Sequence, residues 1–201
     1  MNFLAHLVLA GNDPYLRLGA LLGDFVRGTE ALQRYRPELQ AGILLHRHVD
    51  GFTDSLPAVA ALRNSCPKPF RRYAGIVIDL LFDHELAQGW NRYQRQSLKA
   101  FDAGVRELLW RHAELVPDRL ARFMAYADRR GLFAAYREKE EILISLAGIG
   151  RRLSRPNPLH RVDEIWERIE PLAAACFDGV FAEVQSEIDA WLKSKSTTTG
   201  S

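Results

Sequence analysis

Apolar residues recur every three or four positions along residues 165–191, and this periodicity is the strongest constraint on the fold. The stripe comprises Ile165, Ile169, Leu172, Cys176, Val180, Val184, Ile188 and Trp191. Such spacing places side chains on one face of a helix, which Pro171 is expected to kink. No segment alternates apolar and polar residues in a sustained way, and no Asn-Gly hairpin occurs. The sequence therefore predicts an all-α fold.

Further helices are expected in residues 14–28, 37–52, 70–95, 97–116 and 116–131. Asp13 and Pro14 form a typical helix start, and Gly131 a typical helix end. The length of 201 residues suits one domain with a well-developed core. We therefore expect a single helical bundle over residues 1–192, with a loop at 148–158 and a polar, disordered tail at 193–201.

Composition narrows the classes of protein that remain. A formal net charge of +2 is too small to indicate nucleic-acid binding by itself. Cys66 and Cys176 lie far apart and cannot form a disulfide framework, which favours a reducing, cytoplasmic setting. The apolar first ten residues have no basic leader, and no later apolar run approaches the length that spans a membrane. We expect no membrane partner.

Residues 75–90, "GIVIDLLFDHELAQGW", place carboxylates where a core is expected. On a helix of 100° per residue, Asp79 and Asp83 lie about 40° apart and inside the apolar arc. A buried carboxylate without a partner is costly, so each needs a base, hydrogen-bond donors or a cation. A single aspartate in such a place more often caps a neighbouring helix or pairs with an arginine. Asp79 fits that role, or that of a support for a site.

Similar features recur in "AGILLHRHVDGFTD". His46 and Asp50 are four residues apart, so an imidazole and a carboxylate share one helix face. His48 lies on the other side of the same helix and is expected at the surface. Asp24 follows an apolar turn whose small residues would let another helix approach closely. His6 lies at the centre of an apolar segment, where a lone histidine is more often a core residue.

Together these positions give three histidines and three aspartates on apolar helices in the first half of the chain: His6, Asp24, His46, Asp50, Asp83 and His84. A mixed imidazole and carboxylate set suits a divalent ion such as manganese, magnesium, iron or zinc. The sequence has no phosphate-binding loop of the Walker type and no nucleophile elbow. Hydrolysis by metal-activated water is therefore the chemistry that these residues support.

Arginines accompany the acidic positions, and a guanidinium group binds phosphate oxygens in pairs. A phosphoester substrate is a reasonable inference, with the expected contacts at Arg27, Arg47, Arg71 and Arg72. Two later basic clusters, 129–130 and 151–155, are candidates for a positively charged face that binds an acidic protein. Runs of charged residues are more often simply exposed to solvent, with no partner.

Four segments in order, "MNFLAHLVLA", "GALLGDFVRG", "AGILLHRHVDGFTD" and "RRYAGIVIDLLFDHELAQGW", resemble the bacterial acyl carrier protein phosphodiesterases over about the first 90 residues. The resemblance implies a divergent relative of the HD-domain phosphohydrolases. It also implies manganese-dependent hydrolysis of holo-acyl carrier protein to the apo-protein and 4′-phosphopantetheine, with magnesium or iron as alternative ions. The acidic carrier protein would then be the partner of the basic clusters.

The same resemblance assigns the polar positions of the motifs to the site. It implies metal ligands among the six His and Asp residues, and catalytic roles for Asp24, His46 and Asp83. Asp24 is the candidate for a shared role as ligand and base. The contiguous pair reads Asp83-His84, the reverse of the usual HD order. The set of residues that touches the ion therefore stays open.

Two alternatives remain at this stage. One is an HD-type hydrolase of a free nucleotide or another small phosphoester, which would have the same fold and metal site. The other is a helical binding module without enzymatic activity, whose buried acids and histidines form hydrogen-bond networks.

Overall fold

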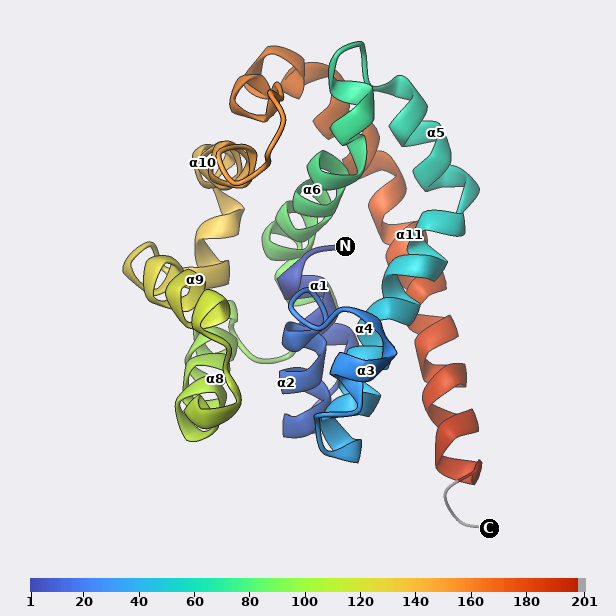
Figure 1. The fold of residues 1–201 in the computed structure, drawn as a ribbon. Coiled ribbons are helices and arrows are strands. Elements are labelled where there is room, and N and C mark those ends of the chain that lie inside the picture. The colour runs from blue at the N-terminus through green and yellow to red at the C-terminus, as the bar shows by residue number, and fades with distance from the viewer. Residues whose placement is uncertain (199–201) are drawn as a thin grey trace.

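The computed structural model describes residues 1–198, and all regular elements in this part of the chain are helices (Figure 1). The α-helices are α1 (Phe3–Leu9), α2 (Pro14–Leu22), α3 (Gly28–Leu32), α4 (Pro37–Ser55), α5 (Pro57–Ser65), α6 (Ala74–Gln88), α7 (Trp90–Tyr93), α8 (Leu98–Arg111), α9 (Asp118–Arg129), α10 (Lys139–Gly150) and α11 (Asp163–Thr198). Four short 3-10 helices join them: η1 (Phe70–Tyr73), η2 (Ala113–Leu115), η3 (Leu132–Arg137) and η4 (Leu159–Arg161). The all-α prediction is confirmed.

The start of α2 follows the sequence signal. The Asp13 carboxylate accepts hydrogen bonds from the amides of Tyr15 and Leu16, and Pro14 occupies the first helical position. The predicted end near Gly28 is wrong, because α2 stops at Leu22. The amides of residues 25 and 26 both donate hydrogen bonds to the Leu22 carbonyl oxygen, and the resulting turn places residues 24–27 outside the helix.

Helices α2 and α4 pack in direct backbone contact through two glycines. A Cβ on Gly19 would lie 2.4 Å from the Leu39 carbonyl oxygen and 2.7 Å from the Cα of Gly42. The close approach expected from the small residues before Asp24 is therefore confirmed. It brings the C-terminal end of α2 against the middle of α4, where His46 lies.

Helix α6 lies in the middle of the molecule, with α10 on one side and α5 and α11 on the other (Figure 1). Its apolar residues are buried nearly all round, as expected for a helix without a polar face. All seven residues of α1 are buried as well, and α1 packs on α6 and α2. The expected long helix at 70–95 is divided into η1, α6 and α7, since Gly89 ends α6.

Helix α11 is the longest element and includes Pro171 without interruption. Most of the predicted stripe is buried, but Leu172 is 46% exposed and Phe177 and Phe181 fill the core instead. The helix continues through residues 193–198, which the sequence assigned to a disordered tail, and 199–201 lie outside the described residues.

Within the described residues, no helix is both long and apolar enough to cross a membrane.

Candidate functional site

Helices α1 and α4 bring three of the predicted residues together. The Nε2 atom of His6 lies 3.1 Å from one carboxylate oxygen of Asp50, and the Nε2 atom of His46 lies 3.2 Å from the other. The two imidazole rings stack with their centroids 3.8 Å apart. Among the described residues, these three form the only group of three or more His, Cys, Asp or Glu whose ligand atoms lie within 4.8 Å of one another. We call this group the His/Asp cluster.

Contacts with residues of α2 and with Gly23 fix the orientation of the His46 ring. Its Nδ1 atom lies 2.8 Å from the carbonyl oxygen of Ala20 and therefore donates a hydrogen bond to it. In the neutral imidazole this leaves the lone pair on Nε2, which points toward Asp50. Gly23 makes room for the ring, because a Cβ at that position would lie 2.2 Å from the His46 Cγ. A histidine held in this way through its second nitrogen is typical of metal ligands.

Asp24 lies at the edge of the cluster. Its Oδ1 atom is 3.6 Å from the Nε2 of His46, and its side chain is half exposed. Burial raises the pKa of Asp24, but the neighbouring His46 outweighs this and holds it below the ordinary value. Asp24 is therefore ionised at neutral pH and offers a fourth donor on the accessible side of the cluster.

The cluster attracts positive charge. Burial opposes a charge on His46, but its hydrogen bonds with Asp24 and Asp50 raise its pKa to about 9. Burial and the neighbouring His46 lower the pKa of His6. Burial would raise the pKa of Asp50, but hydrogen bonds from both histidines hold it well below its usual range. The two carboxylates thus face one imidazolium and, at Asp50, the α-ammonium group of Met1 at 3.7 Å. A divalent cation would compete with the proton on His46.

The structure does not bring Asp83 into the cluster. Its carboxylate is fully buried and accepts hydrogen bonds from the amides of Leu4, at 2.8 Å, and Ala5, at 3.1 Å. Burial raises the pKa of Asp83 to about 7, although the two amides oppose this shift. Asp83 thus holds the start of α1, the capping role that the sequence left open for a single buried aspartate. Asp79 accepts a hydrogen bond from the α-ammonium group of Met1 at 2.8 Å and fixes the same segment.

His84 also lies apart from the cluster. Its Nδ1 atom is 2.6 Å from the carbonyl oxygen of Tyr136, and its Nε2 atom is 3.0 Å from the Gln88 amide. The ring meets the face of Trp166 edge-on, with centroids 5.4 Å apart. His84 therefore joins α6 to η3 and α11. His48, expected at the surface, is partly buried and contacts Glu187 at 2.9 Å.

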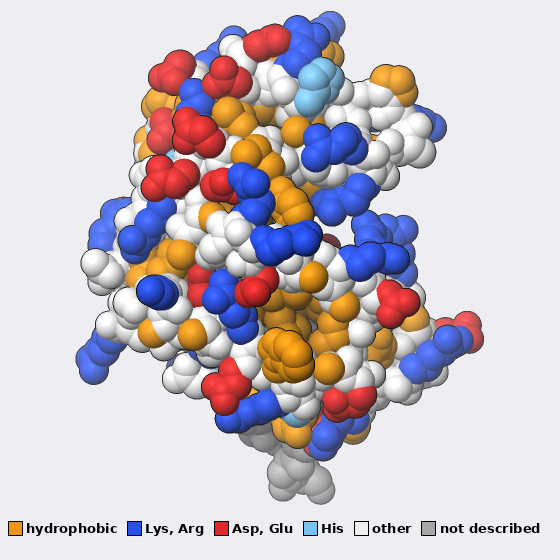
Figure 2. All heavy atoms as spheres, turned by 90° about the vertical axis from the view of Figure 1, so that its left-hand side faces the viewer, with side chains coloured by type: hydrophobic (Ala, Val, Ile, Leu, Met, Phe, Trp, Pro, Cys, Tyr) orange, Lys and Arg blue, Asp and Glu red, His pale blue; other side chains and the backbone are white. Residues whose placement is uncertain are grey.

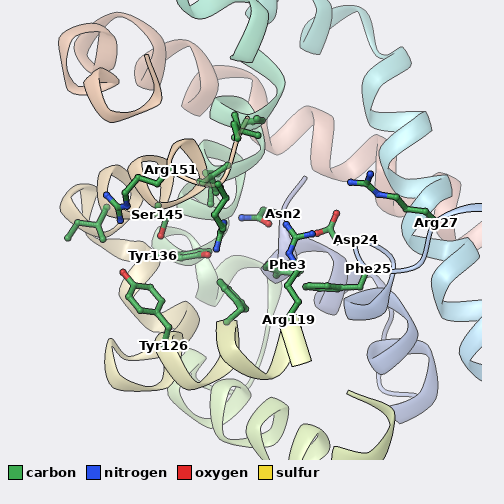
Figure 3. A pocket seen from close by; sticks show the side chains of 18 residues that line it. Asn2, Phe3, Asp24, Phe25, Arg27, Arg119, Tyr126, Tyr136, Ser145 and Arg151 are labelled. Atoms are coloured by element: carbon green, nitrogen blue, oxygen red, sulfur yellow. The ribbon is translucent and has the colours of Figure 1, made fainter. Parts of the chain in front are cut away.

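A cavity of about 530 Å³ opens beside Asp24 (Figure 3). It lies between the start of α1, the turn after α2, and the segment from α9 to α10. Its lining is largely apolar and aromatic, with cationic groups added: Asn2, Phe3, Asp24, Phe25, Arg27, Ile76, Leu80, Arg119, Phe123, Tyr126, Tyr136, Ile144, Ser145, Gly148, Ile149, Arg151, Arg152 and Leu153. This size and composition are typical of sites for small organic ligands.

Four arginines line the cavity: Arg27, Arg119, Arg151 and Arg152. None of them forms an ion pair or donates a hydrogen bond to another described residue. Arg119 lies over the ring of Phe25, 5.8 Å from its centroid. Figure 2 shows Lys and Arg side chains gathered around a hollow on this face of the molecule. Unpaired guanidinium groups around a cavity are suited to an anionic ligand.

Of the four arginines predicted to bind substrate, only Arg27 lines this cavity. Arg47 donates to the carbonyl oxygens of residues 26 and 28, and so fixes the turn after α2. Arg71 donates to the carbonyl oxygens of residues 64 and 66, and Arg72 is exposed away from the lining. Arg151 and Arg152 are indicated by the sequence only as part of a basic cluster, and the isolated Arg119 is not indicated at all.

The fold and the site define a class: an all-α protein in which a His/Asp cluster, suited to a divalent ion, adjoins a cationic cavity. The chain belongs to the acyl carrier protein phosphodiesterase family, whose model matches residues 1–184. The resemblance noted in the first 90 residues is thus confirmed, and it extends over most of the chain. No solved structure shows significant similarity to it.

Curated relatives named acyl carrier protein phosphodiesterase agree with this assignment. The protein from Yersinia enterocolitica is 34% identical over 93% of this chain and 99% of its own length. The protein from Serratia proteamaculans is 38% identical over 77% of this chain and 80% of its own length. The protein from Escherichia coli O6:H1 is 34% identical over 79% of this chain and 82% of its own length.

Proposed function

We propose that this protein hydrolyses the phosphodiester that joins 4′-phosphopantetheine to a serine of holo-acyl carrier protein. The observation that carries the proposal is the position of the His/Asp cluster beside a cavity with four unpaired arginines. The names of the relatives give the same activity. The two free cysteines suit a reducing compartment such as the cytoplasm. The arginines of the cavity would attract an acidic carrier protein.

The donor set fits a divalent ion. His6, His46 and Asp50 present ligand atoms to one point, and Asp24 adds a carboxylate on the open side. Nitrogen and carboxylate donors suit manganese, with magnesium or iron as alternatives, and leave positions for water and phosphate. When bound, such an ion would supply positive charge that lowers the pKa of water and offsets the charge that develops on phosphate.

The residues around the cluster have separate roles in this proposal. Asp24 accepts the proton of the attacking water as the new bond to phosphorus forms. The bond between phosphorus and the serine oxygen then breaks, and Asp24 returns the proton to that oxygen. Arg27 and Arg119 bind the non-bridging phosphate oxygens and stabilise their charge. Ala20 and Gly23 keep His46 in its orientation throughout.

The test is to incubate the protein with holo-acyl carrier protein and manganese, and to follow the carrier protein by mass spectrometry. We expect loss of the mass of phosphopantetheine, no loss in the presence of EDTA, and no loss with an Asp24→Asn variant. Turnover of free nucleotides but not of the carrier protein would favour the HD-type nucleotidase instead. A protein that binds no divalent ion, and whose thermal unfolding is indifferent to manganese and EDTA, would indicate a binding module.

A further inference from the structure

The cavity beside Asp24 has two chemically different ends. At one end, Asp24 lies between Arg119 and Arg27, next to Phe25 (Figure 3). At the other end lie Tyr126, Ser145 and Arg151, and the space between is bounded by Asn2 and Phe3. The end at Asp24 is the end that reaches the His/Asp cluster.

Asp24 is the only carboxylate among the described residues that line this cavity, so the four arginines outnumber it and repel one another. Burial lowers the pKa of Arg152, and the charges of Arg119 and Arg151 lower it further. By contrast, Arg130 outside the cavity pairs with Glu141. An unpaired cluster of this kind costs stability unless an anion enters it. The cavity therefore calls for a ligand with negative charge at the cluster end.

Apart from Arg151, the groups at the far end of the cavity are uncharged, and they suit a partly polar chain. Tyr136 is nearly buried and lines this end together with the hydroxyl group of Ser145, while Ile144 and Ile149 add apolar surface. The pantetheine arm has matching parts in order: a phosphate, a branched hydrocarbon unit, two amides and a thiol. Hydroxyl groups can meet the amides, and aromatic and aliphatic side chains can cover the hydrocarbon part.

We propose that this cavity binds the pantetheine arm of the carrier protein, with the phosphodiester held by Arg27 and Arg119 at Asp24 and the thiol end beside Ser145. This inference rests on the proposed function and specifies how the substrate lies in the site. It assigns specificity to α9, η3 and α10, because these elements form the far end of the cavity. The carrier protein itself would then cover the open side at Arg27.

Gly148 offers a direct test, because it lines the cavity from α10 and has room around it. A Cβ on Gly148 would meet only the Arg151 guanidinium, at an ordinary 3.7 Å. The first carbon of a side chain at this position is therefore tolerated, and Gly148→Leu places further apolar atoms at the cavity wall. The matched control is Gly104→Leu in α8, where a Cβ would have nothing within 4 Å and which does not line the cavity.

The probe is free 4′-phosphopantetheine, titrated by calorimetry into the manganese-loaded protein. We expect Gly148→Leu to weaken its binding at least ten-fold and to raise the KM for holo-carrier protein by a similar factor. Gly104→Leu should match the wild type in both, and the unfolding temperature of each variant checks that it is folded. Adenosine monophosphate, titrated in parallel, should bind more weakly than 4′-phosphopantetheine.

Each outcome decides one claim. Equal binding of 4′-phosphopantetheine by wild type and Gly148→Leu, no binding by the wild type, or tighter binding of adenosine monophosphate would overturn the assignment of the cavity. Cleavage of holo-carrier protein by the wild type decides the proposed function separately. The enzyme can therefore be a carrier-protein phosphodiesterase even if the arm binds elsewhere.

Discussion

Replacing Gly19 by alanine should separate α2 from α4. The new Cβ would lie 2.4 Å from the Leu39 carbonyl oxygen, whereas ordinary contacts begin at 3.4 Å, so the helices must move apart by about 1 Å. Both opposing groups are backbone and cannot rotate away. Overpacking of this kind costs about 3 kcal/mol at the upper end of its range, and the better helix propensity of alanine offsets about 1 kcal/mol. We expect a net loss of about 2 kcal/mol.

The matched control is Gly51→Ala, which lies in α4 and where a Cβ would have nothing within 4 Å. It should gain up to about 1 kcal/mol from helix propensity alone, so the two variants should differ by about 3 kcal/mol. Urea unfolding followed by far-UV circular dichroism measures this difference. Because the shift also stretches the 2.8 Å bond between His46 and Ala20, manganese binding by Gly19→Ala should weaken about 10-fold or more. Equal urea midpoints for the two variants would refute the argument.

Three further predictions concern single side chains. His46→Ala should lower manganese affinity about 100-fold or more in calorimetry, whereas His48→Ala, on the same helix, should leave it unchanged. Asp83→Ala leaves two buried α1 amides without an acceptor and should lower the free energy of unfolding, measured with urea, by about 2–4 kcal/mol. Unchanged stability together with a loss of manganese binding would instead indicate that Asp83 is a ligand. Burial raises the pKa of Asp102 from 3.8 to about 6, so the folded protein binds this proton more tightly than the unfolded chain does. The stability that this proton contributes is complete below pH 3.8 and is lost as the pH rises to about 6. Asp102→Asn keeps an acceptor for the Ala134 amide and should exceed the wild type in stability by about 1 kcal/mol above pH 6, after allowance for screening, but not at pH 4; a constant difference across this range would contradict it.

The fold class and much of the site could be predicted from local sequence patterns. Periodicity predicts the helices, and the spacing of His46 and Asp50 places both on one face of α4, where the structure has them. The small residues before Asp24 predict the close approach of α2 and α4. These features depend on residues near one another in the chain, so local geometry is enough.

The partners of buried charges could not be predicted in the same way. Asp83 and His84 satisfy the same local criteria as His6, being polar and buried on apolar helices. What separates them is a contact with a distant segment: Asp83 meets the amides of α1, and His84 meets the Tyr136 carbonyl. Arg119 gave no signal because nothing in its own helix shows that it faces a cavity. Only the packing of the helices decides which buried group has a protein partner already.

The cluster and the far wall of the cavity come from separate parts of the chain. Residues 6–50 supply the His/Asp cluster and Asp24, whereas residues 119–153 supply most of the cavity wall opposite. The two parts touch where Arg119 lies over the ring of Phe25, but no residue of 119–153 belongs to the His/Asp cluster. Substitutions in the second part can therefore alter which molecule is accepted without replacing a residue of the His/Asp cluster. In this architecture, reactivity and selectivity are free to evolve at different rates.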